Sequence, residues 1–91
     1  MYRSSWNLRN FKKGLRLVEN IARQNTTREV DFTTGYAIAH VADLKEHGRI
    51  TKAQKKALED LIYETAEDTI DEIERDEHEV VEDGLHILSM R

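Results

Sequence analysis

The chain has 91 residues, of which 38% are hydrophobic and 35% are charged, enough apolar material for one small domain with a modest core. It contains no cysteine, so disulfides and thiolate metal sites are excluded. No apolar run approaches the ~20 residues that span a bilayer, and the first residues lack the apolar core of a signal peptide. We therefore expect a single small helical domain over residues 1–91, in a soluble cytoplasmic protein with no membrane contact.

The net charge of −4 conceals a strong separation of charge along the chain. Residues 1–56 contain twelve Lys and Arg against five Asp and Glu, a balance of +7, whereas residues 57–91 contain two against thirteen, a balance of −11. Such asymmetry between halves points to a charged partner, or to self-association in which basic and acidic segments meet. The remaining interpretation is that the two halves neutralise each other inside the fold.

The first predicted helix covers about residues 5–24. Leu8, Phe11, Leu15 and Val18 follow one another at spacings of three and four, the pattern of a helix with one face toward the core. Gly14 lies inside this helix, either as a weak point or as a position of close approach to a neighbour.

The second predicted helix covers residues 34–47. The preceding segment, 24–34, is polar and rich in β-branched and capping residues, so it predicts a connection with at most a short extended piece. Ala37, Val41 and Leu44 then recur at helical spacing, which indicates the face that packs inward.

A tight turn joins the second helix to the third. Gly48 supplies the left-handed residue that commonly ends a helix. Thr51 and Gln54 form a capping box, in which each side chain satisfies a backbone amide that the helix start leaves unpaired. Because only about four residues separate the two helices, they should pack against each other as an αα-hairpin. A DNA-binding helix-turn-helix fits poorly, since the second of these helices turns strongly acidic from Glu59.

The third predicted helix, residues 52–83, is long and acidic. Thirteen carboxylates lie between Glu59 and Asp83, interrupted by a single arginine, Arg75. At about 1.5 Å per residue this helix spans roughly 48 Å, whereas a compact domain of this size has a radius of gyration of roughly 12 Å. The helix should therefore outrun its own core. Either a second copy of the chain covers its far end, which we expect, or the helix breaks near residues 75–79, or its last turns stand free in solvent.

The end of the chain admits two interpretations. Asp83-Gly84 either terminates the long helix and leaves an apolar tail at 85–91, or forms the turn of a β-hairpin between apolar flanks. Helical periodicity continues through Val80 and Val81, which favours the helix end. Apolar residues of the third helix and of this tail form the predicted homodimer interface, namely Ile62, Ile70, Ile73, Val80, Leu85, Ile87 and Leu88.

No motif indicates an enzyme. The chain has no glycine-rich phosphate loop, no cysteine nucleophile and no serine in a nucleophile elbow. Glu74, His78 and Glu82 share a helix face and resemble metal ligands, but Arg75 stands where the Glu-x-x-His motif of bundle di-iron sites requires a carboxylate. We therefore predict an all-α, three-helix, dimeric protein with no cofactor, no metal site and no catalytic residue.

The charge pattern favours an interaction protein, in particular a small regulator or inhibitor of the kind that phage-like and mobile-element genes encode. At roughly one carboxylate per 3 Å, two copies of the third helix would approach the charge density of duplex DNA, about one charge per 1.7 Å. An acidic face of this density could imitate nucleic acid toward a nucleic-acid-handling enzyme. The predicted partner-binding residues are Asp60, Glu64, Glu67, Asp68, Asp71, Glu74 and Glu82.

The alternative is a regulator that binds nucleic acid directly through its basic N-terminal half. Lysines and arginines crowd the polar side of the first helix and the start of the third, where they can contact phosphates. The candidate residues are Arg9, Lys12, Lys13, Arg16, Lys52, Lys55 and Lys56. The two hypotheses use opposite halves of the chain, so the arrangement of these charges in space bears on both.

Overall fold

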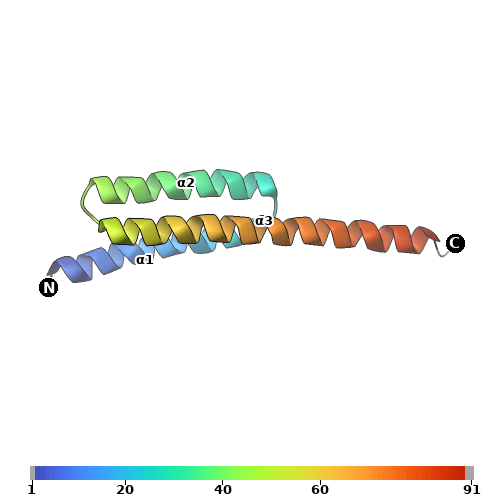
Figure 1. The fold of residues 1–91 in the computed structure, drawn as a ribbon, viewed down its shortest axis with the longest axis horizontal. Helices are drawn as coiled ribbons and strands as arrows, with labels where there is room; N and C mark the ends of the chain where they lie inside the picture. Colours follow the sequence, from blue (N-terminus) through green and yellow to red (C-terminus); the bar gives the residue numbers. More distant parts are fainter. Residues whose placement is uncertain (1, 90–91) are drawn as a thin grey trace.

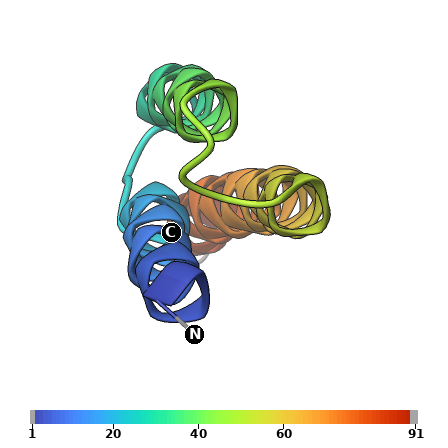
Figure 2. The same cartoon turned by 90° about the vertical axis from the view of Figure 1, so that its left-hand side faces the viewer.

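A computed structural model describes the backbone of residues 2–89 and the side chains of residues 8–77. Within that range the chain forms three helices and no strand: α1 (Tyr2–Ala22), α2 (Thr27–Glu46) and α3 (Lys52–Ser89). α1 and α3 run in the same direction and α2 runs opposite to both (Figure 1). Seen from the end, the three helices occupy the corners of a triangle (Figure 2). The all-α, three-helix prediction is confirmed.

The core lies where the three helices meet, and each helix contacts both others. Its buried apolar residues are Ile21, Val30, Ala37, Val41, Leu44, Ile50, Leu58, Ile62 and Ala66. Within α2 and α3 they recur at helical spacing, so one stripe of each helix faces inward. Thr33 and Thr69 are also buried, and their hydroxyls donate to backbone carbonyl oxygens four residues earlier, each at 2.7 Å. Both polar groups are therefore satisfied within their own helices.

The predicted connection over 24–34 is wrong, because α2 begins at Thr27. Thr26 is extended, with φ −128° and ψ 153°, and its hydroxyl oxygen accepts a hydrogen bond from the Glu29 backbone N–H at 3.1 Å. The same hydroxyl donates to the Glu29 carboxylate at 2.9 Å. Thr26 and Glu29 stand at the spacing of a capping box, the signal that correctly predicts the start of the third helix. The polar composition of the segment hid this helix start, and Val30, which lies within the predicted connection, is a buried residue of the α2 stripe.

The turn between α2 and α3 is confirmed in detail. Gly48 has φ +66° and its N–H donates to the Lys45 carbonyl at 3.0 Å, while the Arg49 N–H donates to the Leu44 carbonyl at 2.8 Å. These two bonds form a Schellman motif, which satisfies carbonyls that the helix end leaves free. Ile50 follows and is buried in the core.

The predicted capping box at the start of α3 is also present. The Gln54 N–H donates to the Thr51 hydroxyl at 3.0 Å, and the Thr51 N–H donates to the Gln54 side-chain oxygen at 2.9 Å. With α2 and α3 in contact on either side of this short turn, the αα-hairpin is confirmed.

The first helix begins and ends earlier than the expected range of 5–24. α1 spans Tyr2–Ala22, and its C-terminal turn tightens, because the Arg23 and Gln24 N–H groups donate to carbonyls three residues back, each at 3.2 Å. The Gln24 side chain also donates to the Asn20 carbonyl at 2.8 Å. These bonds satisfy the free carbonyls of the helix end without a further helical turn.

The third helix does not end at Asp83-Gly84 and does not form a hairpin there. α3 continues to Ser89, so most of the expected tail at 85–91 lies within it. A single glycine costs a helix only about 1 kcal/mol relative to alanine, which is too little to stop it alone. The molecule measures 69 × 20 × 15 Å, and the C-terminal part of α3 extends past the ends of α1 and α2 (Figure 1). The expectation that this helix outruns its own core is met.

Gly14 is a position of close approach between α1 and α3. A Cβ atom at Gly14 would lie 2.5 Å and 2.8 Å from the two terminal methyl carbons of Leu58. Leu58 is fully buried in the core, so its side chain has little room to move away. Gly35, in the middle of α2, has no atom within 4 Å of the corresponding Cβ position and is exposed.

These two glycines make a matched pair for a stability test. We expect Gly14→Ala to destabilise the protein by about 1–3 kcal/mol from overpacking, despite a gain in helix propensity of about 1 kcal/mol. Gly35→Ala should stabilise it by about 0.5–1 kcal/mol, because it gains the same propensity without a clash. Urea unfolding followed by circular dichroism measures both.

A double-mutant cycle identifies the partner of Gly14. In a Leu58→Ala background the space beside Gly14 is opened, so Gly14→Ala should cost less there than in the wild-type chain. Equal stabilisation by Gly14→Ala and Gly35→Ala would contradict the close approach.

Candidate interaction surfaces

The predicted acidic residues from Asp60 to Glu74 lie on one exposed face of α3. Positions 60, 64, 67, 71 and 74 follow one another at spacings of four and three, which keeps them on one side of a helix, with Asp68 beside them. All six are exposed. Ile62 lies two positions from both Asp60 and Glu64, about 200° around the helix, and is fully buried. The acidic face therefore points away from the core; the side chain of Glu82 lies outside the described residues.

The ion pairs between described lysine side chains and carboxylates lie within one helix rather than between helices. Between Lys or Arg and carboxylates, the described side chains form two ion pairs, Lys55 with Glu59 at 3.0 Å and Lys56 with Asp60 at 3.2 Å. Both join residues four apart within the first turns of α3. From Glu64 to Glu74, none of the carboxylates on the acidic face pairs with a cation in the part of the chain whose side chains are described.

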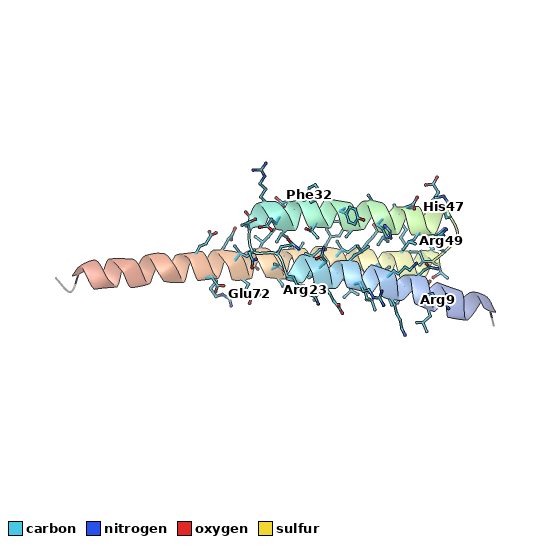
Figure 3. The ribbon with its side chains drawn as sticks, turned by 180° about the vertical axis from the view of Figure 1, so that it is seen from behind. Arg9, Arg23, Phe32, His47, Arg49 and Glu72 are labelled. Atoms are coloured by element: carbon cyan, nitrogen blue, oxygen red, sulfur yellow. The ribbon has the colours of Figure 1, made fainter. Side chains whose placement is uncertain are left out.

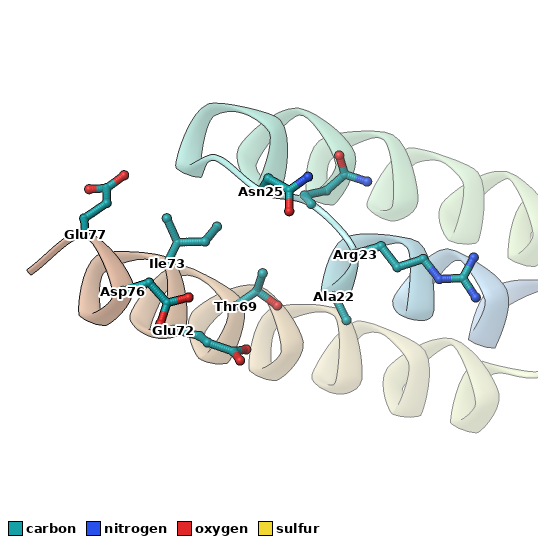
Figure 4. Close-up of a pocket in the computed structure, with 9 residues that line it drawn as sticks. Ala22, Arg23, Asn25, Thr69, Glu72, Ile73, Asp76 and Glu77 are labelled. Carbon is teal, nitrogen blue, oxygen red and sulfur yellow. The ribbon is translucent and has the colours of Figure 1, made fainter. Parts of the chain in front are cut away.

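A cleft at the end of the bundle shows, among its described side chains, the same absence of ion pairs between helices. Its volume is about 280 Å³, and it lies between the end of α1, the start of the connection to α2, and α3. Glu72, Asp76 and Glu77 line it from α3, and Arg23 lines it from the start of the connection to α2. Figure 4 shows the Arg23 guanidinium pointing away from these carboxylates. α1 and α3 thus meet here without an ion pair, and Ile73 supplies the half-buried apolar floor.

The predicted basic residues lie on α1 and α3 at the same end of the molecule, which we call the basic end. Because Gly14 packs on Leu58, the start of α3 lies beside the first half of α1. The four cations of α1 in the predicted set are exposed and form no ion pair with any described carboxylate: Arg9, Lys12, Lys13 and Arg16. Lys52 is exposed as well, whereas Lys55 and Lys56 are engaged by Glu59 and Asp60.

The predicted dimer interface needs one correction. Ile62 is fully buried inside a single chain, where it packs in the core between the helices, so it is not available to a second copy. Ile70 and Ile73 pack against the same core and remain half-buried. The side chains of Val80, Leu85, Ile87 and Leu88 lie outside the described residues. The helical periodicity of the sequence shows which residues of α3 are on its apolar side. It does not show which of them are buried within one chain and which remain accessible to a second copy.

An exposed row of aromatic side chains lies on α2. Phe32 is 78% exposed and Tyr36 is 57% exposed. The ring of Tyr36 stacks on that of His40, with centroids 6.1 Å apart and planes 20° apart. We call Phe32, Tyr36 and His40 the aromatic ridge; in Figure 3, Phe32 lies near the start of α2. Their spacing of four residues is a helical signal, but it was hidden because Phe32 was assigned to a connection.

The described residues show neither a metal cluster nor a membrane span. No group of three or more potential metal ligands comes together among the side chains from 8 to 77. None of the helices, over the same part of the chain, has a stretch both long and apolar enough to cross a bilayer. Apart from single exposed apolar side chains such as Leu61 and Tyr63, the exposed features of the described residues are the acidic face, the basic end and the aromatic ridge.

The unpaired carboxylates of α3 predict that salt stabilises the protein. Like charges three or four residues apart on a helix repel one another, and the Debye length falls from about 30 Å at 0.01 M salt to about 3 Å at 1 M. We expect the melting temperature to rise as sodium chloride is raised from low to high concentration, as measured by circular dichroism. Neutralising Glu64, Asp68 and Asp71 should shrink this dependence. A melting temperature that falls with salt would mean that attractive pairs dominate instead.

Comparisons with known proteins give no match to this chain. No family model, no curated protein and no solved structure matches it. A three-helix arrangement alone does not indicate an activity, since function resides in the side chains that a fold displays. The charge and exposure of those side chains are what indicates a function here.

Proposed function

We propose that this protein is a non-enzymatic regulator or inhibitor that binds a basic macromolecular partner through the acidic face of α3. The partner that fits best is a nucleic-acid-handling enzyme, whose positively charged groove would otherwise hold nucleic acid. The observation that supports this most is the lack of compensation: the carboxylates from Glu64 to Glu74 are exposed and have no cation partner among the described side chains.

The charge density supports imitation of nucleic acid. Between Glu59 and Asp83 the chain carries thirteen carboxylates, roughly one per 3 Å of helix. Duplex DNA carries about one charge per 1.7 Å, so two such helices side by side would approach it. A positively charged groove that binds the phosphates of nucleic acid would also attract these carboxylates, over a similar distance. Salt would weaken the binding of the groove to nucleic acid and to this protein alike.

The fold supports a rigid presentation of this face. The core covers the opposite side of α3, so the carboxylates are held on a supported helix rather than on a loop. Binding would then require little ordering of the backbone, which lowers the entropic cost of association.

A charge-neutral variant tests the acidic face. We expect Asp60→Asn, Glu64→Gln, Asp68→Asn and Asp71→Asn together to abolish capture of the partner from a host lysate by the immobilised protein. Wild-type protein should release the captured partner when excess duplex DNA is added, because both compete for one basic groove. Circular dichroism should show an intact fold, since all four side chains are exposed.

A second variant with the same change of net charge is the control. Glu59, Glu72, Asp76 and Glu77 lie off the acidic face, and their replacement by Gln or Asn also removes four negative charges. This variant should still capture the partner. Equal loss in both variants would mean that net charge alone drives binding, and full capture by the first variant would refute the proposed face.

Direct nucleic-acid binding by the basic end is the second candidate function. The four exposed cations of α1 in that set make no ion pair with the described carboxylates, so they are available to phosphates. Salt-sensitive retention of the pure protein on a DNA or RNA column would favour this candidate over the first.

We further propose that the functional species is a homodimer joined through the part of α3 that extends past α1 and α2. Ile70 and Ile73 pack against the core and remain half-buried, and the sequence of α3 continues with Val80, Leu85, Ile87 and Leu88. Burial of one such side chain contributes roughly 1.5–3 kcal/mol, so several across a two-fold interface could offset the cost of association.

Light scattering at micromolar concentration tests the dimer. The expected mass is twice that of the 10.6 kDa chain. Replacing Leu85 and Leu88 by glutamate should yield the monomeric mass, because charged side chains are costly in an apolar interface. A monomeric mass for the wild-type protein would contradict the proposed assembly.

A further inference from the structure

From the face formed by α1 and α2 we propose that the protein binds single-stranded nucleic acid, with bases stacked on the aromatic ridge and phosphates held by cations of α1. This inference rests on the second candidate function and makes it specific. It is independent of the acidic face of α3.

The first observation is the exposure of the ridge. Phe32 and Tyr36 present most of their surface to solvent, although aromatic side chains bury large apolar areas when a fold can cover them. With His40, which stacks on Tyr36, they stand one helical turn apart along α2. Successive residues of the aromatic ridge are therefore about 6 Å apart along the axis of α2. An extended single strand can place successive unstacked bases at such a spacing, whereas the paired bases of a duplex are closed to side chains of this kind.

The second observation is a row of cations on α1. Positions 9, 13, 16 and 20 follow one another at spacings of four and three, so they share one side of the helix, and Arg23 follows three residues later, directly after the helix ends at Ala22. Four of them are exposed cations and the fifth, Asn20, is an exposed amide; Figure 3 shows Arg9 and Arg23 toward opposite ends of α1. We call Arg9, Lys13, Arg16 and Arg23 the cationic row.

A groove places Asn20, which shares one side of α1 with the row, beside the ridge. One part of the groove, of about 460 Å³, is lined by Asn20 from α1, by Gln24 from the connection, and by Arg28 and Phe32 from α2. A second part, of about 230 Å³, is lined by Asn20, Phe32 and Tyr36. Because α1 and α2 are antiparallel, Arg16, one turn before Asn20, falls level with the next ridge residue, His40.

The chemistry of this face favours a single strand over a peptide. Two isolated rings and an imidazole do not make the broad apolar patch that an amphipathic helix requires. Aromatic platforms beside a basic track are instead the recurring arrangement of single-strand binding, where each base stacks regardless of its identity. The side-chain amides of Asn20 and Gln24 add hydrogen-bonding groups for base edges.

Two of the acidic groups near this face have contacts of their own. Glu29 lines the groove, but its carboxylate accepts from the Thr26 hydroxyl at 2.9 Å. Asp43, one turn beyond the ridge, contacts the imidazole of His47 at 3.2 Å. The acidic face belongs to α3 and points away from the bundle, so at moderate salt its repulsion is screened over about 10 Å.

The experiment is fluorescence anisotropy of labelled oligothymidine and oligouridine with the full chain, beside a DNA duplex of equal length. We expect binding of the single strands at about 50 mM salt that weakens steeply by about 200 mM. Phe32→Ala and Tyr36→Ala should each lower the affinity about tenfold. Tyr63→Ala, which removes a 55% exposed tyrosine from α3, should leave it unchanged, and Tyr36→Phe, which keeps the ring, should retain binding.

Charge variants separate the phosphate contacts from the stacking. Lys13→Gln and Arg16→Gln should each reduce the slope of log affinity against log salt by about 0.7, while Arg75→Gln on α3 should not. Circular dichroism of every variant checks the fold.

The outcomes distinguish the inference from the function on which it rests. If binding depends on salt but Phe32→Ala and Tyr36→Ala do not weaken it, the proposed stacking of bases on the aromatic ridge is wrong. A preference for the duplex would also contradict that stacking. Either result would still be consistent with nucleic-acid binding by the basic end. An equal loss with Tyr63→Ala also overturns the proposed stacking. The absence of binding to any probe overturns both, and the acidic-face proposal is untouched.

Discussion

The contact between Gly14 and Leu58 sets the geometry on which the other surfaces depend. With no side chain at Gly14, α1 approaches α3 closely enough for Leu58 to fill the core between them. A helix that buries one stripe must expose the opposite one. Fixing the inward side of α1 and α3 therefore fixes which charges they display, the cations on one helix and the carboxylates on the other.

The separation of charge in the sequence becomes a separation in space. The ion pairs between Lys or Arg and carboxylates among the described side chains lie within α3 and join neighbours on one helix. Exposed pairs of this kind contribute only about 0.3–0.5 kcal/mol each. Apolar burial rather than electrostatics must hold the three helices together, and most of the described charged side chains of α1 and α3 remain exposed.

The two kinds of exposed surface lie on different sides of the molecule. The acidic face belongs to α3, whereas the aromatic ridge and the cationic row belong to α2 and α1, and the helices occupy three corners of a triangle (Figure 2). A partner on one side need not block the other. The proposals for these surfaces can accordingly be tested, and can fail, independently.

Several local features of this protein could be predicted from its amino-acid sequence. The capping box at Thr51 and the left-handed Gly48 were predictable because each depends on a few neighbouring residues. The exposure of the acidic face followed from helical periodicity alone. Thr26 and Glu29 also have the spacing of a capping box. The polar composition of residues 24–34 is equally typical of a connection, so this helix start was not predicted.

Which apolar side chains are buried within one chain depends on how the helices pack. Periodicity placed Ile62 on the apolar side of α3 but could not tell whether α1 and α2 or a second copy covers it; packing buries it within one chain. Likewise, nothing local to α2 indicates that Phe32 lies beside Asn20 of α1. Such neighbours depend on the register between helices, which is set by side chains far apart in the sequence, here by the fit of Leu58 against Gly14.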